Sequence, residues 1–409
     1  MTVADSWHDP VECWSRLAVL ASAMLLSMTT WFSATAVAPQ LLLLWDMDSG
    51  QAAWLTIAVQ VGFIVGALAS AALSLPDWIP PRRLMLYGAL GAAAANALLL
   101  LSPNASVAIA LRLLTGIFLA GVYPPAMKSM ATWFRYKRGT ALGVMVGALT
   151  LGSATPHLIN GLGGLDWEIV IALTSLLTLA GGLVAEFLGR DGPYSFPPGS
   201  FNPGKAWEAF TQKRVLLASF GYFGHMWELY AMWAWFSVFF ADTLLRHSVP
   251  SAAKWAAIGT FVVIGIGAVG CWIGGIISDN WGRARTAALS MLISGSCAVV
   301  IGFMQDESIA LVLLVGLIWG FWVVADSAQF SVMVTEVAAQ QYVGTVLTLQ
   351  LAIGFALTIP TIWLIPLIQH AASWGWAMAF LGLGPLLGAA AMRVLIRTSE
   401  KRSLTDGQA

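Results

Sequence analysis

The chain has 409 residues, of which 58% are hydrophobic and only 10% are charged, and its mean hydropathy is +0.79. Soluble domains carry about 25% charged residues, so this composition excludes a protein that covers its whole surface with polar side chains. The formal net charge is zero, which gives no support to a nucleic-acid partner.

Apolar runs of membrane-spanning length recur along the whole chain. A helix needs about 20 apolar residues to cross a ~30 Å hydrocarbon core, and unpaired backbone groups are too costly in lipid for anything but helices here. The approximate bounds of the runs are 17–44, 52–75, 84–101, 105–127, 139–163, 168–188, 214–241, 255–277, 285–303, 308–330, 343–368 and 374–396. The sequence therefore predicts an all-α membrane protein with about twelve transmembrane helices.

The basic residues predict the orientation of these helices. If the N-terminus is cytoplasmic, the outer loops hold only Arg246 and Lys254, Arg112 falls within a span, and the other seventeen Lys and Arg residues are cytoplasmic. This asymmetry satisfies the positive-inside rule and predicts a multi-pass protein of a bacterial inner membrane with both termini in the cytoplasm. A cleaved signal peptide ending near 34–36 is the alternative, but the preceding segment is acidic and the apolar run continues to Leu44.

The segment 189–213 interrupts the apolar pattern with prolines and glycines and ends in a short polar and apolar stretch. It is interpreted as a cytoplasmic linker with a brief interfacial helix. It divides the chain into predicted six-helix bundles over 1–188 and 214–409. The two parts repeat short patterns in the same order, among them 31–33 with 235–237 and 139–142 with 344–347, which indicates two pseudo-symmetric bundles.

A charged loop between two spans carries the most specific motif. Gly275, Asp279, Gly282, Arg283 and Arg285 are spaced G-x-x-x-D-x-x-G-R-x-R after the eighth predicted span. A weaker copy follows the second span, where Asp77 and two arginines remain and prolines replace the glycines, and 111–116 forms a further pattern, L-R-x-x-x-G, in the fourth span.

Together with the linker and the order of spans, these motifs resemble the major facilitator superfamily. The resemblance implies a secondary transporter that rocks two halves around a central site lined by helices one, four, seven and ten. It implies gating roles for Asp77, Asp279, Arg283 and Arg285, with Asp279 pairing either with a helix N-terminus or with an arginine across the halves.

Ionisable side chains inside spans indicate where function lies, because each costs about 2.5–3.5 kcal/mol on insertion scales. Arg112, His225, Glu228 and Asp326 fall on the fourth, seventh, seventh and tenth spans. We expect substrate binding or proton coupling from the following residues: Arg112, Tyr222, His225, Glu228, Trp235 and Thr30. Tyr222, His225 and Glu228 are expected to share one helical face, Arg112 and Glu228 can pair across the cavity, and Asp326 is expected in an inner gate.

Structural alternatives exist for the same residues. Arg112 can brace helices through backbone carbonyls, His225 can be a packing histidine, and tryptophans are often interface anchors. The predicted function is secondary active transport of a small organic or inorganic anion with proton coupling. The alternatives are a proton-driven exporter of amphipathic compounds and a transporter-like sensor.

Several classes lack support in the sequence. No Walker-type nucleotide loop is present, and the cysteines, histidines and acids show no metal or catalytic spacing. We therefore expect no enzyme activity, no cofactor and no metal. The expected partners are a small-molecule substrate, protons and the lipid bilayer, with the chain acting as a monomer.

Overall fold

The computed structural model describes residues 11–164, 166–194, 203–338 and 343–406, and every regular element within these ranges is helical. Within these described ranges, eleven helical segments are long and apolar enough to cross a membrane. The helix α12 (Lys213–Arg246) has 34 residues, and at 1.5 Å per residue it exceeds the needed length. The predicted all-α architecture of about twelve membrane helices is confirmed.

The first six spans lie before Leu188 and form the first half of the molecule. Several are built from more than one helix. The elements are α1 (Cys13–Ser27), η1 (Met28–Thr30), α2 (Ser33–Ala36), α3 (Ala38–Leu44), α4 (Ser49–Ala72), α5 (Leu75–Trp78), α6 (Pro81–Ala97), η2 (Leu98–Leu101), α7 (Ala105–Leu119), α8 (Tyr123–Ala131), α9 (Arg138–Leu162) and α10 (Trp167–Leu188).

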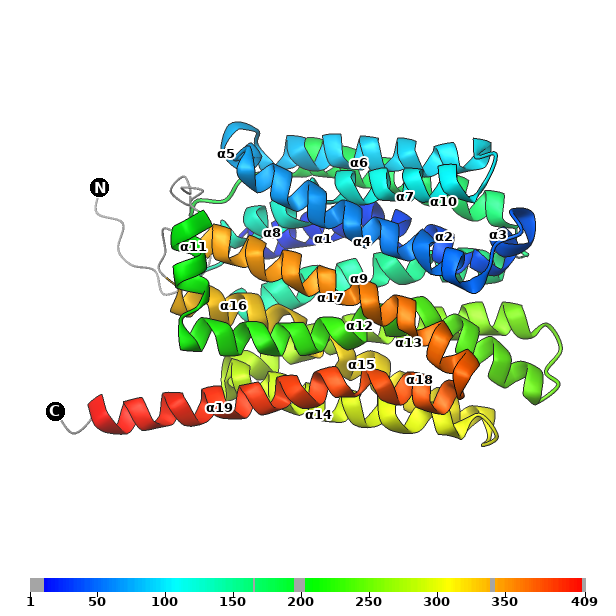
Figure 1. The fold of residues 1–409 in the computed structure, drawn as a ribbon. Helices are drawn as coiled ribbons and strands as arrows, with labels where there is room; N and C mark the ends of the chain where they lie inside the picture. Colours follow the sequence, from blue (N-terminus) through cyan, green and yellow to red (C-terminus); the bar gives the residue numbers. More distant parts are fainter. Residues whose placement is uncertain (1–10, 165, 195–202, 339–342, 407–409) are drawn as a thin grey trace.

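The second half begins at Lys213 and repeats this arrangement after a short helix, α11 (Pro203–Phe210). Its elements are α12, α13 (Ala252–Trp281), α14 (Arg283–Ile301), η3 (Gly302–Met304), α15 (Ile309–Ala325), α16 (Ser327–Val337), α17 (Val343–Ala371), α18 (Trp374–Leu381) and α19 (Leu383–Asp406). The end of the molecule that carries α11 and the last turns of α19 is called the linker end (Figure 1).

The first and tenth spans are both broken at mid-length. In the first span, α1 ends at Ser27 and a run of threonines forms η1 before α2 begins at Ser33. Serine and threonine hydroxyls compete with backbone hydrogen bonds and weaken a helix interior. In the tenth span, Asp326 separates α15 from α16. Each break frees backbone carbonyls inside the protein, and these need donors from neighbouring helices.

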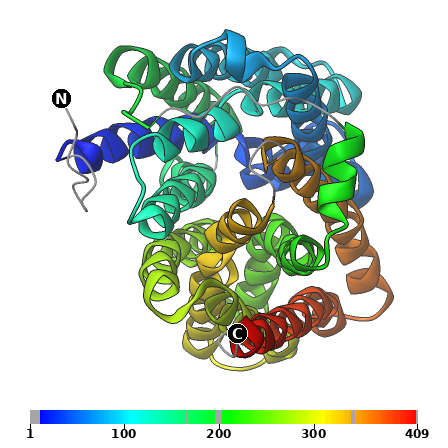
Figure 2. The ribbon, with the colours of Figure 1, turned by 90° about the vertical axis from the view of Figure 1, so that its left-hand side faces the viewer.

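The two halves touch along α9 and α13, which pack closely against each other. An added Cβ at Gly143 would collide with the carbonyl oxygen of Cys271, and one at Gly275 would lie 2.8 Å from the carbonyl oxygen of Gly139. Only glycine permits backbones to approach this closely. Looking onto the linker end, Figure 2 shows the first half above the second, with α9 and α17 between them. A single hydrophobic core includes buried residues of both halves.

Candidate functional site

Aromatic side chains from both halves meet midway along the bundle. The central aromatic cluster consists of Trp31, Phe32, Phe63, Tyr230, Trp233 and Phe355. The ring centroids of Phe63 and Phe355 are 4.7 Å apart, and those of Trp31 and Tyr230 are 5.8 Å apart. These contacts join the first span and α4 to α12 and α17, and every ring is buried. The cluster fills the space between the halves with apolar, polarisable surface.

Some buried polar groups of the cluster and of the helices that carry or flank it have no hydrogen-bond partner. Among the described residues, the buried side chains in this region with atoms that lack a hydrogen-bond partner are Trp31 and Trp233 (Nε1), Ser153 (Oγ), His157 (both ring nitrogens) and Gln60 (both amide atoms). Gln60 precedes Phe63 of the cluster by three residues on α4, so the two lie on neighbouring positions of one helix face.

Ser153 and His157 lie at the level of the break in the first span. The helix α9 runs parallel to that span and beside it, because Gly152 packs against Leu25 while the amide of Asn160 donates to the carbonyl oxygen of Ala36 at 2.7 Å. Residues between 152 and 160 are therefore level with residues between 25 and 36.

A buried polar group without a partner costs about 1–3 kcal/mol. These five side chains therefore retain hydrogen-bonding capacity that no described residue satisfies. The sequence signal for them was only a polar residue within an apolar span. Asn96 and Asn160 link helices through hydrogen bonds of their side-chain amides, but Gln60 has no such link among the described residues.

Arg112 is fully buried within the first half and holds the broken first span together. Its Nη1 donates to the carbonyl oxygen of Thr30 at 2.9 Å, its Nη2 donates to that of Trp31, and its Nε donates to that of Leu55 at 3.2 Å. Asn96 also accepts from Nη1, at 3.1 Å. All three nitrogens are thus bound to neutral acceptors, several of them carbonyls freed by the break.

This geometry corrects two expectations. Arg112 does not pair with Glu228, because its guanidinium is engaged inside the first half and the Glu228 carboxylate is engaged inside the second. The hydroxyl of Thr30 accepts a hydrogen bond from Thr178 at 3.3 Å and is completely buried. It therefore faces α10 of its own half, not the interface between the halves.

The three polar residues Tyr222, His225 and Glu228 of α12 do not all converge on one site. Successive steps of three residues turn by about 60° around a helix, so Tyr222, His225 and Glu228 fan over about 120° and meet different neighbours. Tyr222 approaches Gly354 of α17, His225 reaches the break in the tenth span, and Glu228 reaches α14 and α15. Tyr222 and His225 nevertheless share a neighbour in Phe330, and their ring centroids are 6.2 Å apart. The predicted shared face therefore holds for neighbouring pairs of these residues, but the three side chains do not reach one common partner.

His225 and Asp326 form a buried pair at the break between α15 and α16. His225 Nδ1 lies 2.9 Å from Asp326 Oδ1, and its Nε2 lies 2.9 Å from the hydroxyl of Ser327. The helix break places Asp326 here, because it is both the last cap of α15 and the first cap of α16. Cys271 donates to the freed carbonyl oxygen of Val324 at 3.2 Å. Both members of the pair can carry a proton.

Glu228 is held by two donors of its own half. Trp319 Nε1 donates to Oε1 at 2.7 Å, and the hydroxyl of Ser294 donates to Oε2 at 2.9 Å. The carboxylate is 1% exposed and has no cationic partner among the described residues. A buried carboxylate with neutral donors can exist with or without its proton, so Glu228 is a second candidate proton carrier.

Trp235 has a structural partner. Its indole Nε1 donates to the carbonyl oxygen of Ile362 at 2.9 Å. Pro366 lies four residues further along α17 and has no N–H to offer that carbonyl. Trp235 therefore supplies the hydrogen bond that the proline removes, and its expected contact with substrate has no support in this arrangement.

The charged loop joins the halves at the linker end. Asp279 Oδ2 accepts hydrogen bonds from both the backbone N–H and the hydroxyl of Thr140, each at 3.0 Å. Thr140 lies in the first turn of α9, so the carboxylate binds a helix N-terminus of the other half, as the motif predicted. Arg283 lies 3.4 Å from Asp279 and donates through Nε to Glu336 at 2.8 Å.

The other residues expected to act in gating are Asp77, Arg285 and Asp326. The side chain of Asp77 lies outside the described residues. Arg285 is exposed on α14. Asp326, expected in an inner gate, is the partner of His225 within the second half, and its role in gating stays a prediction.

Comparison with known proteins assigns the chain to one family over most of its length. The family model of the Major Facilitator Superfamily matches residues 20–360. The chain belongs to the major facilitator superfamily. Transport is therefore the function class of this facilitator, in agreement with its helices, its two halves and the loop at Asp279.

Two known transport proteins are similar to the facilitator, one in part of its sequence and one in fold. It is 30% identical over 213 residues to the multidrug efflux pump LfrA of Mycolicibacterium smegmatis, a match that covers 50% of this chain and 41% of the pump. The match thus spans less than half the length of that relative. Its fold is similar to a bacterial homologue of the human lysosomal transporter Spinster in an inward-facing, unoccupied conformation. The TM-score is 0.64 at 14% identity, with 95% of this chain and 96% of that chain covered.

Proposed function

We propose that this facilitator is a proton-coupled exporter of amphipathic aromatic compounds. The observation that carries the proposal is the central aromatic cluster between the halves, with buried unpaired polar groups beside it. Aromatic rings supply apolar contact and stacking, and the unpaired groups supply hydrogen bonds to a polar end of the substrate. The partial similarity to a multidrug efflux pump supports the same class.

The anion expected from the sequence depended mainly on Arg112. In this arrangement the guanidinium is 0% exposed and donates to acceptors on the first span, α4 and α6. An anion would have to displace several of these bonds and open the break in the first span. The geometry therefore favours the alternative substrate class.

Proton coupling would act through α12. Its face toward α15 and α16 carries His225 and Glu228, while its face toward the interface carries Tyr230 and Trp233 of the aromatic cluster. Gain or loss of a proton on the first face changes how α12 packs against the tenth span. Because one rigid helix carries both faces, this change reaches the substrate cluster.

Alternating access would require the bridge between Asp279 and Thr140 to break. We propose that the linker end faces the cytoplasm of a bacterium, since nearly all basic residues outside the spans lie there. Transport would then proceed by rocking of the halves 1–188 and 214–409 within a monomer in the inner membrane.

Reconstitution into liposomes with an internal pH dye tests this proposal. An amphipathic aromatic compound should release or consume protons as it crosses, and Tyr230→Ala should weaken its apparent affinity. A panel of small anions should produce no comparable signal. A response to anions that Arg112→Ala abolishes would reverse the choice of substrate class. Binding of aromatic compounds without flux of solute or protons would favour a sensor.

A further inference from the structure

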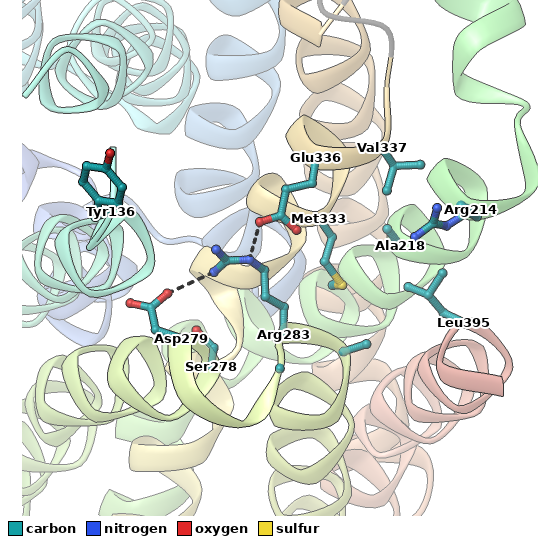
Figure 3. A pocket seen from close by; sticks show the side chains of 12 residues that line it. Tyr136, Arg214, Ala218, Ser278, Asp279, Arg283, Met333, Glu336, Val337 and Leu395 are labelled. Carbon is teal, nitrogen blue, oxygen red and sulfur yellow. Dashed lines mark hydrogen bonds and ion pairs between the residues drawn. The ribbon is translucent and has the colours of Figure 1, made fainter. Parts of the chain in front are cut away.

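A cavity lies at the linker end, apart from the central cluster. Its volume is about 450 Å³, which lies within the range of small-molecule pockets, about 300–1,000 Å³. Its walls come from α12, α13, α14, α16 and α19 of the second half, and one further wall is Tyr136, just before α9 of the first half. Figure 3 shows Tyr136 and Arg214 on opposite sides of Arg283.

Of the charged side chains that line this cavity, the two acids and Arg283 bind one another, whereas Arg214 does not take part in these ion pairs. Arg283 lies between Asp279 and Glu336 and makes ion pairs with both (Figure 3). Asp279 is further engaged by the N-terminus of α9. The Nε–H of Arg214 is buried and has no hydrogen-bond partner within the described residues. The acids that line the cavity are thus already bound, and Arg214 is a donor that remains available.

The wall beside Arg214 is apolar. It is formed by Ala218, Met333, Val337 and Leu395. A guanidinium binds phosphate or carboxylate oxygens through parallel N–H donors, and an apolar wall at its side accommodates the organic part of such a ligand. We propose that this cavity binds a phosphate ester, with its phosphate on Arg214 and its ester portion on the apolar wall.

Such a ligand would stabilise the contact between the halves at the linker end. The cavity needs Tyr136 from the first half and Asp279 in its position against α9. Separation of the halves would remove the Tyr136 wall, so the ligand binds this closed arrangement more tightly than an open one. A ligand shifts a conformational equilibrium by its differential affinity, and the phosphate ester would therefore slow opening at the linker end.

The phosphate can come from a soluble ester or from a lipid headgroup, and two binding experiments distinguish these sources. The full chain is placed in nanodiscs of neutral lipid, and its thermal unfolding is followed while glycerol 3-phosphate is added. In the second experiment, phosphatidylglycerol replaces part of the neutral lipid. The proposal expects a saturable rise in melting temperature in at least one of them. No rise in either would overturn it.

Arg214→Gln and Lys213→Gln form a matched pair for both experiments. Lys213 is the exposed neighbour of Arg214, does not line the cavity, and loses the same charge on substitution. Loss of Arg214 should weaken binding about tenfold or more, because a charge-assisted hydrogen bond to the phosphate disappears. Equal weakening by both substitutions would indicate general surface attraction and would refute the site. Arg214→Lys keeps the positive charge but lacks the parallel N–H donors of the guanidinium, so it should recover only part of the affinity.

The effect on opening needs a separate measurement. Cys271 of α13 lies beside Gly143 of α9, does not line the cavity and is 1% exposed. In a chain with Cys13 and Cys297 replaced by Ser, its thiol should therefore react with a maleimide only when the halves separate. Saturating ligand should slow this reaction compared with the same chain without ligand, and Arg214→Gln should remove the slowing. An unchanged rate at saturation would refute the regulatory effect. None of these measurements uses a transported substrate, so their failure would leave the proposed export untouched.

Discussion

Replacement of Glu228 by Gln is the sharpest test of proton coupling. Gln keeps the size of the side chain, its Oε1 still accepts from Trp319, and its amide can donate to the hydroxyl of Ser294. We therefore expect a loss of folding stability below about 1 kcal/mol, since both contacts are retained in neutral form. The variant cannot, however, release or bind a proton at this position.

The expected effect on accumulation follows from the number of protons carried. One proton moved across a gradient of one pH unit contributes about 1.4 kcal/mol, which is a tenfold concentration ratio of substrate. If Glu228 carries one proton and the His225–Asp326 pair carries another, the highest concentration ratio of substrate across the membrane is about a hundredfold per pH unit. Glu228→Gln should lower this concentration ratio to about tenfold per pH unit. Exchange of substrate for substrate, which needs no net proton movement, should remain intact.

The assay is steady-state accumulation of a fluorescent amphipathic compound in proteoliposomes with an imposed pH gradient. Glu307→Gln provides the control, because Glu307 is exposed in the loop after η3 and loses the same charge. If Glu228→Gln reached the same accumulation ratio as the native chain at every gradient, Glu228 would not carry a coupled proton. The reasoning from its burial and neutral donors would then be refuted.

Three further substitutions test contacts of single residues. Asp279→Ala removes the bridge to α9 and should weaken closure by about 1–3 kcal/mol, measured as faster cysteine labelling at the linker end. Asn280→Ala, which loses only a bond within its own helix, should leave that rate unchanged. Arg112→Lys should lower the unfolding free energy by about 2–4 kcal/mol, because an ammonium cannot reach all the acceptors that the guanidinium spans; a melting temperature equal to that of the native chain would contradict the bracing role. Trp235→Phe should cost about 1 kcal/mol in thermal unfolding, since the carbonyl of Ile362 loses its donor, with little change in substrate affinity; a large loss of affinity at native stability would restore Trp235 to the substrate site.

The membrane helices and the loop motif could be predicted because they depend on local properties. Each span is a continuous apolar run, and a run of this length has one stable conformation in lipid. The partner of Asp279 was also predictable in kind, because a carboxylate at a helix end seeks a helix N-terminus or an arginine. The structure places both Thr140 and Arg283 beside it.

The ionisable residues within the spans were correctly singled out as buried, but their partners were not predictable. Whether Arg112 faces the interface or its own half depends on which way α7 is rotated within the bundle. The same is true of Glu228 on α12, where a rotation of 100° per residue separates one face from another. Rotation is decided by packing against neighbouring helices, at contacts such as Gly143 against Cys271.

The amino-acid sequence by itself determined the class of the protein, its membrane helices and the charged contact between its halves. Each of these depends on hydrophobicity or charge along a short segment. Only the tertiary structure decided that the aromatic rings of α4, α12, α17 and the first span share one space, and that Ser153, His157 and Gln60 are left without partners beside them. The physical reason is that an unpaired polar group is defined by what surrounds it, and its surroundings come from helices far apart in the chain.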